Sequence, residues 1–259
     1  MRTRSTTKTS KKELPTDKNG LLADTAYALI KRSIIRCDLE PGQPITEEQL
    51  GTRFGIGRAA ARAAIKRLHQ EQFIHRLTRN RYVVAPITLK HVNELFELRL
   101  LLEPAAARLA AGKLDAETQR RLQELARARY QVGDRKSAEA FLRANTEFHA
   151  LIAHASGNSL LASVIRGMLD KVERVHHMSH LLRDRSAEAI HEHQELLDAL
   201  VAGDADRAEQ VMIQQILAAK QFVIEAMLAS SSLQTVNVAL SSSNRSWRAA
   251  APSRSRKTR

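Results

Sequence analysis

The sequence predicts a mainly α-helical protein in two parts, an N-terminal winged helix-turn-helix and an all-helical bundle of six or seven helices. Three observations support this prediction. Residues 21–86 hold three helical patterns and a short strand-like hairpin, residues 87–230 show only helical periodicity, and positive charge is concentrated outside the second segment. The 259 residues are enough for two domains, each with its own core.

The formal net charge of +13 is unevenly distributed along the chain. Residues 1–20, 21–86, 87–230 and 231–259 carry +4, +5, −2 and +6 respectively. Both ends of the chain are poor in apolar residues, so we expect basic disordered tails over 1–20 and 231–259. The positive charge favours a polyanionic partner, double-stranded DNA, for the first domain and the tails.

The cysteine content and the hydropathy of the sequence indicate the cellular compartment of the protein. The single cysteine, Cys37, excludes an internal disulfide framework and a multi-cysteine metal site, and it is typical of a reducing compartment. The N-terminus MRTRSTTKTSKKELPTDKNG lacks the apolar core of a signal peptide, and no apolar run reaches the roughly 18 residues of a membrane span. We therefore expect a cytoplasmic protein with no membrane partner.

The first domain begins with two helices. The first pattern places Tyr27, Ile30 and Ile34 on one face, and the segment DLEPGQPI ends it with two prolines and a glycine. A second helix follows from Thr46, because TEEQL has the form of a capping box in which Thr46 and Gln49 satisfy each other's backbone N–H groups. The sequence FGIG then forms a tight turn suited to glycine.

The third helix has two distinct faces. Arg58, Arg62 and Lys66 recur at four-residue intervals on one face, with Arg67 near its edge. Small alanines between them keep that side slim enough for a DNA major groove about 12 Å wide. A different face carries the apolar stripe of Ala61, Ala64, Ile65 and Leu68.

The segments FIHRL and RYVV predict two short strands joined by TRN, a hairpin with Arg79 and Arg81 at its tip. A capped helix, a glycine turn, a helix with a basic face and a basic hairpin follow the order of a winged helix-turn-helix. This order favours DNA contact over an ordinary solvated surface for the basic residues. The candidate DNA-binding residues are Thr46, Arg58, Arg62, Lys66, Arg67, Arg79 and Arg81.

Residues 87–230 are predicted to be helical throughout. Polar or glycine breaks near Gly112, Gly133, Gly157, residues 183–186 and Gly203 divide them into six helices. Aromatic residues are scarce, so we expect a core of Leu, Ile, Val and Ala. A nearly neutral bundle behind a DNA-binding head indicates a sensor and dimerisation domain.

Polar side chains interrupt the apolar stripes of four bundle helices. Arg99 lies in the first stripe, and Asn145 and His149 lie on the inward face of the third helix. His193 and Gln215 occupy similar positions in the fifth and sixth helices. Because a buried polar group is costly without a partner, a shared cavity that holds a ligand or water is an economical explanation. The first stripe consists of Val92, Leu95, Phe96, Leu102, Ala106 and Leu109.

Arg99 restricts the chemistry of such a ligand. A guanidinium stays charged in a protein and offers a planar fork to a carboxylate, which favours a small organic acid as effector. The alternative is that Arg99 pairs with an internal carboxylate such as Glu147 or Glu195.

The first domain resembles a known family. The segment LIKRSIIRCDLEPGQPITEEQLGTRFGIGRAAARAAIKRLHQEQFI is similar to the DNA-binding domain of GntR-family transcriptional regulators, over roughly residues 22–86. The PG turn, the paired helices and the spacing of two arginines support the resemblance. It implies that Arg58 and Arg62 are the pair that contacts bases and phosphates.

The second domain resembles the FCD effector domain found behind one large branch of GntR heads. The similar segments are VNELFELRLLLEPAAARLAAG, NTEFHALIAHASGNSLL and EHQELLDALVAGDADRAEQVM. The resemblance implies an all-helical bundle that binds small organic acids.

Many FCD domains hold a divalent metal (zinc, nickel or manganese) through an Asp-x3-His pair and two later histidines. Carried over by position, these ligands fall on Asn145, His149, His193 and Gln215. Only two of them are histidines, and amide oxygens bring no negative charge. We therefore expect no cofactor, and we assign these side chains, with Arg99, to an effector or ordered water. The alternative is a divalent metal held by His149 and His193 with Asn145 and Gln215, where water or the effector completes the coordination.

Together these features predict a ligand-responsive, homodimeric repressor that binds an inverted-repeat operator. One alternative is an architectural DNA-binding protein without an effector, which would show strong salt dependence and little site preference. A helical metal-dependent hydrolase is a weaker alternative, because zinc catalysis generally uses three good protein ligands and an open position. The sequence has no nucleophile motif or phosphate-binding glycine loop, so we do not expect an enzyme.

Overall fold

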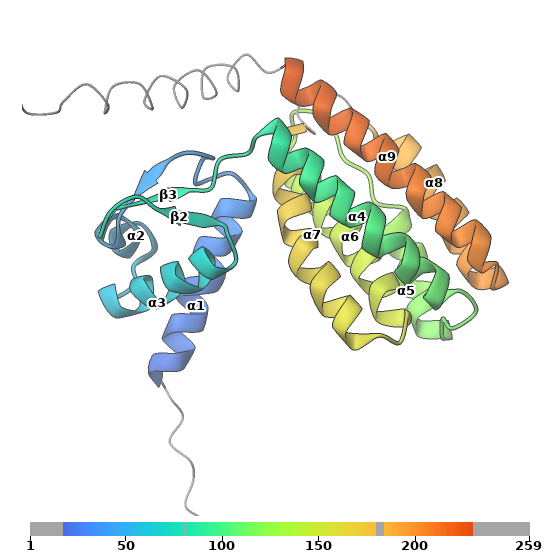
Figure 1. The fold of residues 1–259 in the computed structure, drawn as a ribbon, viewed down its shortest axis with the longest axis horizontal. Coiled ribbons are helices and arrows are strands. Elements are labelled where there is room, and N and C mark those ends of the chain that lie inside the picture. Colours follow the sequence, from blue (N-terminus) through green and yellow to red (C-terminus); the bar gives the residue numbers. More distant parts are fainter. Residues whose placement is uncertain (1–17, 80, 180–183, 230–259) are drawn as a thin grey trace, which may run out of the picture.

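The computed structural model describes residues 18–79, 81–179 and 184–229. Over these residues the chain forms a head of three helices with a small sheet, followed by a bundle of six helices (Figure 1). The mainly helical, two-part fold predicted from the sequence is confirmed. The predicted tails lie outside the described residues, except that the first helix begins at Lys18, inside the segment 1–20 predicted as tail.

Apolar side chains of all three head helices and of the sheet meet in one core. The largest fully buried ones include Ile30, Ile34, Leu50, Leu68 and Phe73. α1 packs along α3 and supports it from behind. The elements are α1 (Lys18–Ile35), β1 (Pro44–Ile45), α2 (Glu47–Phe54), α3 (Arg58–Gln70), β2 (Ile74–Arg76) and β3 (Tyr82–Val84).

The start and end of α2 follow the local chemistry predicted for them. Thr46 Oγ1 accepts a hydrogen bond from the Gln49 N–H at 3.2 Å, and Gln49 Oε1 accepts one from the Thr46 N–H at 2.9 Å. The capping box is therefore confirmed. Gly55 ends α2 with a φ of 64°, a left-handed conformation that costs glycine little. α3 starts at once, and its N-cap Gly57 has no side chain with which to cap it.

The sheet has one strand more than the sequence predicts. The segment DLEPGQPI does break the chain after α1, but Pro44–Ile45 then pairs antiparallel with β3, with Ile45 opposite Tyr82. The strand order is β1-β3-β2. Gly42, with a φ of 82°, forms the turn, and its N–H donates to the Val84 carbonyl at 2.9 Å. A strand of two residues is too short for the alternating pattern to be recognised.

The bundle contains the six predicted helices, separated at the predicted breaks. α4 pairs most extensively with α9, and α6 packs against α7 (Figure 1). Aliphatic side chains dominate the core, with few aromatic rings. The helices are α4 (Leu89–Ala110), α5 (Ala116–Ala126), α6 (Arg135–Ala155), α7 (Ser159–Ser179), α8 (Ser186–Ala202) and α9 (Ala205–Ala229).

The stripe predicted for α4 is wrong at two positions. Leu102 is only partly buried, and Leu109 is 41% exposed. Ala106 of the predicted stripe is buried, and the other buried positions in that half of the helix are Glu103, Pro104, Ala107 and Ala110. Small alanines let α4 approach its neighbours closely. The prediction chose the leucines because leucine is more hydrophobic than alanine, and hydropathy takes no account of how closely two helices pack.

α9 is the one helix in the described part of the chain that has the length and hydropathy of a membrane span. Half of that apolar window is buried inside the protein. The helix packs against α4, α7 and α8, and Val211, Ile216 and Phe222 are among its buried residues. This packing is that of a core helix in a bundle.

Head and bundle are docked against each other along α1 and α7. The connecting residues 85–88 are buried or half-buried. Arg174 of α7 donates from Nη2 to the Ala85 carbonyl at 2.6 Å, and Lys31 Nζ of α1 lies 2.7 Å from Asp170 Oδ2. The head is therefore held against the bundle by polar contacts as well as by the chain.

Candidate DNA-binding face and polar cavity

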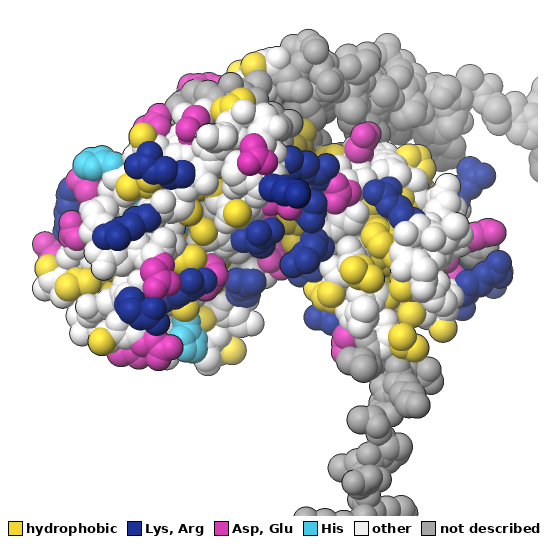
Figure 2. All heavy atoms as spheres, turned by 180° about the vertical axis from the view of Figure 1, so that it is seen from behind, with side chains coloured by type: hydrophobic (Ala, Val, Ile, Leu, Met, Phe, Trp, Pro, Cys, Tyr) yellow, Lys and Arg dark blue, Asp and Glu magenta, His cyan; other side chains and the backbone are white. Residues whose placement is uncertain are grey.

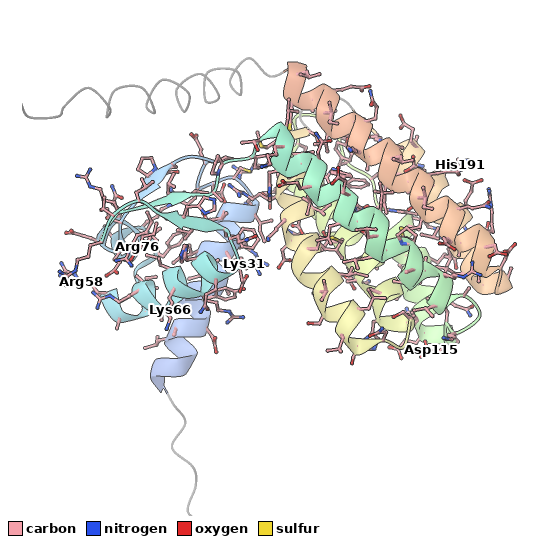
Figure 3. All side chains as sticks on the ribbon, in the orientation of Figure 1. Lys31, Arg58, Lys66, Arg76, Asp115 and His191 are labelled. Carbon is pink, nitrogen blue, oxygen red and sulfur yellow. The ribbon has the colours of Figure 1, made fainter. Side chains whose placement is uncertain are left out.

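The outer face of α3 is the first candidate site. Arg58, Arg62 and Lys66 lie along it, and all three side chains are exposed. Figure 3 shows Arg58 at the part of the head remote from the bundle, with Lys66 further along the same helix. The opposite face of α3 is buried in the head core through Ala64 and Leu68. α3 thus presents a row of cations outward on a supported helix.

Arg62 is oriented by Glu47, the first residue of α2. Its Nε and Nη2 atoms donate to the Glu47 carboxylate at 3.1 and 3.0 Å. The Arg62 side chain is 72% exposed, so the pair adds little stability and the guanidinium can exchange its partner for a phosphate or a base edge. Thr46, another candidate, precedes Glu47 and uses its hydroxyl as the N-cap of α2.

Arg67 does not join the other three cations of α3. Its guanidinium lies 3.6 Å from the centroid of the Tyr27 ring, and its Nε donates to Glu71 at 3.3 Å. Tyr27 and Glu71 also contact Lys31, so Arg67 belongs to the contact between α3 and α1. One residue along a helix turns a side chain by about 100°, which places Arg67 on a different side from Lys66.

The wing is the hairpin of β2 and β3. Arg79 and Arg81 are both exposed at its tip. Arg76, which is not among the predicted contact residues, donates from Nε to the Thr78 carbonyl at 3.1 Å and from Nη2 to the Arg79 carbonyl at 3.3 Å. Arg76 therefore holds the backbone of the wing tip. Its signal in the sequence is an arginine at the end of a strand, directly before the turn.

The second candidate site is a polar cavity inside the bundle. Its volume is about 30 Å³, enough for about one water molecule. The five predicted residues Arg99, Asn145, His149, His193 and Gln215 all line it. They come from α4, α6, α8 and α9, so the fold brings together the inward polar groups of four helices.

Other residues complete the lining of this cavity. Three polar ones are not predicted as site residues, namely His176 of α7 and the ion pair of Arg185 and Glu192, whose Nη2 and Oε1 atoms are 2.5 Å apart. The apolar part of the lining consists of Phe141, Leu142, Ala189, Ala219 and Phe222. Polar and apolar surfaces thus meet in one small space.

A buried group of three charged or titratable side chains lies against the cavity. Arg99 Nε donates to Glu103 Oε1 at 2.6 Å, and His149 Nδ1 lies 2.7 Å from Glu103 Oε2. All three side chains are at most 4% exposed. Burial alone would raise the pKa of Glu103, but its interactions with Arg99 and His149 outweigh burial and lower that pKa to about 2.

Arg99 therefore has an internal carboxylate partner, but neither of the two suggested by the sequence. Glu147 pairs with Arg121, and Glu195 pairs with Arg207, both at partly exposed positions. Glu103 lies one helical turn after Arg99 in α4. That spacing is the sequence signal by which the pair could have been found.

The polar atoms at the cavity that lack a hydrogen-bond partner within the described residues include Nη1 of Arg99, a donor, and Oε1 of Gln215, an acceptor. The amide nitrogen of Gln215 is already used, because it donates to the Glu192 carbonyl. A water or a small ligand in the cavity would satisfy both open groups.

The residues at the family's metal positions do not form a metal-binding set. The rings of His149 and His193 are 5.7 Å apart between centroids, and His149 Nδ1 faces Glu103. Burial, and secondarily the proximity of His149, holds the pKa of His193 well below its usual value, so its ring is neutral. Within the described ranges no three His, Cys, Asp or Glu side chains are placed to hold a metal ion. Two imidazoles and two amides are a weak donor set.

A winged head with an outward cationic helix, docked on a helical bundle with an internal polar cavity, defines a DNA-binding regulator with a sensing domain. Residues 22–84 match the bacterial regulatory proteins of the gntR family, and residues 94–218 match the FCD domain. The chain is therefore a GntR-family transcriptional regulator with an FCD domain, and not an enzyme.

Relatives agree with this assignment. The HTH-type transcriptional repressor RspR of Escherichia coli is 26% identical over 191 residues, which cover 73% of this chain and 83% of that protein. The HTH-type transcriptional regulator YdhC of Bacillus subtilis is 24% identical, over 71% of this chain and 83% of its own length. Among solved structures, E. coli McbR/YncC has a similar fold, with a TM-score of 0.64 at 23% identity, covering 77% of this chain and 97% of that chain.

The buried pair of Arg99 and Glu103 leads to a stability prediction. Glu103→Gln should lower the free energy of unfolding by about 3–5 kcal/mol, because it leaves the Arg99 guanidinium buried without its carboxylate. The matched control is Glu147→Gln, which breaks a partly exposed pair with Arg121 and should cost at most about 1 kcal/mol. Urea unfolding at neutral pH measures both. Equal, small losses of unfolding free energy in the two variants would show that the buried position of Arg99 does not depend on its pair with Glu103.

The same pair fixes the direction of a pH dependence. The pKa of Glu103 is about 2 in the folded protein, against an ordinary value of 4.5, so its contribution to stability is complete above pH 4.5. That contribution is lost as the pH falls from 4.5 towards 2. In this window the unfolding free energy of the wild type should fall more steeply than that of Glu103→Gln.

Proposed function

We propose that this regulator is a cytoplasmic homodimer that binds an inverted-repeat operator, represses transcription, and changes its operator affinity when a small organic acid enters the bundle cavity. The observation that carries the proposal is the combination of two sites in one chain. An exposed cationic helix faces outward from the head, and a buried cavity with an open donor and an open acceptor lies in the bundle. The name of RspR, a repressor, supports the direction of regulation.

The head reads DNA through α3 in the major groove. Arg58 and Arg62 contact base edges and phosphates, while Lys66 and the wing arginines contact the backbone. A single recognition helix covers only a few base pairs, so a second copy related by two-fold symmetry is needed for a selective site.

Substitution of either arginine should weaken specific binding. Arg58→Ala and Arg62→Ala should each cost about 1–3 kcal/mol of affinity for a sequence selected by the wild type from random DNA. Arg120→Ala, at an exposed position of α5, is the control and should have no effect. Gel-shift titration at fixed salt measures all three. Equal affinity of the wild type for selected and scrambled DNA would support the architectural alternative instead.

The surface through which two copies meet is proposed from exposed apolar side chains on α4 and α7. Leu98 and Leu101 lie on α4, and Leu160 and Val164 on α7, and all four are exposed. Leu98 and Val164 line the same cleft, so the two pairs are neighbours. Exposed apolar side chains gathered on two neighbouring helices support an interaction surface there.

Leu101→Glu should convert the dimer to a monomer. The Leu101 side chain is 73% exposed, so the substitution leaves the fold of one copy intact but places a charge in the dimer contact. Leu217→Glu, at another exposed leucine on α9, is the matched control and should remain dimeric. Sedimentation velocity at micromolar concentration distinguishes them. A monomeric wild type, or a dimeric Leu101→Glu, would exclude this face.

The cavity should bind a small acid that also carries a hydroxyl or amino group, with its carboxylate accepting from Arg99 Nη1 and that group donating to Gln215 Oε1. Thermal-shift screening against organic acids of two to six carbons should identify at least one that raises the melting temperature. Gln215→Met should weaken that ligand at least about tenfold, the loss of one buried hydrogen bond, while operator affinity is unchanged. Gln221→Met, at an exposed position of α9, is the control.

Arg99→Ala is unsuitable because it would leave Glu103 buried and unpaired. Equal stabilisation of wild type and Gln215→Met would exclude this contact.

The site should function without a bound metal. Protein purified without chelator and without a metal-affinity tag should contain far less than about one equivalent of zinc, nickel or manganese per chain. Elemental analysis measures this directly. About one equivalent, lost in a His149→Ala/His193→Ala variant, would mean that the amides complete a metal site after all.

A further inference from the structure

We propose that Asp170 and Arg174 of α7 are positioning residues for DNA recognition, which fix the head on the bundle and thereby set the spacing between the two half-sites that a dimer accepts. This inference rests on the proposed function as a dimeric, sequence-specific DNA-binding protein. It concerns residues in the bundle, remote from the face of α3 that would touch DNA.

The first contact is centred on Lys31 of α1, which lies on the side of the head that faces the bundle (Figure 3). Its Nζ atom is 2.7 Å from Asp170 Oδ2, 2.8 Å from Glu71 Oε2 and 2.8 Å from the Tyr27 hydroxyl. Glu71 is the C-cap of α3. One half-buried ammonium group therefore links α1, the end of the recognition helix and α7.

The second contact is made one turn along α7 by Arg174, which is 4% exposed. Its Nη2 donates to the carbonyl of Ala85, the first residue after β3, at 2.6 Å, and its Nε has no hydrogen-bond partner among the residues described. No carboxylate pairs with it in that part of the chain, and burial, opposed only in part by the Cys37 side chain of the head, lowers its pKa to about 10. A guanidinium buried without a carboxylate is costly to stability. What it does is hold the start of the connection between head and bundle.

Further polar contacts surround these two. Arg36 Nη2 of the head lies 2.6 Å from Glu139 Oε1 of α6, and Lys171 Nζ donates to Gln72 Oε1 at 3.1 Å. Seen from behind in Figure 2, Lys and Arg side chains gather along the junction of the two parts. Contacts from both α6 and α7 oppose rotation of the head about its short connection.

A docked head has a consequence for the DNA site. In a symmetric dimer the two recognition helices are separated by a distance that depends on how each head sits on its own bundle. A rigid pair matches half-sites about one helical turn apart and rejects other spacings, whereas heads on flexible tethers tolerate a range. The residues that hold the head therefore contribute to specificity although they contact no base.

The test uses full-length Asp170→Asn and Arg174→Met, with Arg166→Met, an exposed arginine on the same helix, as the control. A site selected by the wild type from random DNA is altered in two ways, by one or two base pairs inserted between the half-sites, and by one base substituted within a half-site. Gel-shift titration then gives two quantities for each protein. The spacing penalty is the fold loss of affinity caused by the inserted base pairs, and the base penalty is the fold loss caused by the substituted base.

We expect a spacing penalty of about tenfold or more for the wild type and Arg166→Met. A loss of affinity of this size is similar to that caused by one mismatched base pair in a site. Asp170→Asn and Arg174→Met should reduce the spacing penalty at least about threefold and leave the base penalty unchanged. A wild type that is indifferent to spacing, variants that keep the full spacing penalty, or variants that lose base discrimination in parallel would each overturn the proposal.

A second measurement does not depend on DNA. Hydrogen exchange in the full-length protein should be at least about tenfold faster at the amides of Ala85, Ile87 and Thr88 in Asp170→Asn and Arg174→Met than in the wild type, with the exchange of α4 and α9 unchanged. Unchanged exchange at these three amides would overturn the docking role. If the wild type selects no sequence from random DNA, the proposed operator function fails, and this exchange result alone decides whether Asp170 and Arg174 hold the head.

Discussion

Glu103 makes it possible for the bundle to keep a charged arginine in its interior. A guanidinium as buried as that of Arg99 cannot shed its proton and has no water to solvate it, so it requires an anion within contact. Glu103 supplies that anion from the next turn of the same helix, and it also meets His149 of α6. This compensation is incomplete, since Nη1 of Arg99, a residue that lines the polar cavity, has no hydrogen-bond partner within the described residues.

The internal pair also changes what the cavity can recognise. A lone arginine would demand an anion to balance it, but Arg99 and Glu103 together present no large net charge, and Arg185 and Glu192 form a second balanced pair on the lining. The proposed acid would be held in such a site by directed hydrogen bonds more than by net charge. Shape and the placement of donor and acceptor groups would then weigh more in the choice of ligand than charge alone.

Features encoded by neighbouring residues could be predicted from the sequence. The capping box of Thr46 and Gln49, the glycine that ends α2 and the breaks between the bundle helices depend on a few adjacent residues. The five polar residues of the cavity could be named because each interrupts the apolar stripe of its own helix. Their common location required only that all the stripes face one core.

The features that were missed or misplaced depend on contacts between distant segments. β1 is defined only by its pairing with β3, and the contact of Arg67 with the ring of Tyr27 joins α3 to a residue of α1 far away in sequence. Leu109 looked like core because its hydropathy exceeds that of Ala107 and Ala110, which pack instead. The link between Lys31 and Asp170 joins residues far apart in sequence, and no local pattern marks it. Glu103 is the exception, since its spacing from Arg99 was visible.

The small size of the cavity has a kinetic meaning. If the proposed organic acid binds there, a space of about 30 Å³ requires forms of the bundle in which the lining has moved apart. Its association rate would then stop rising with ligand concentration once opening of the bundle becomes the slow step, and its apparent affinity would be reduced by the small fraction of open protein. A sensor built in this way would respond to sustained levels of its ligand and not to pulses shorter than its opening time.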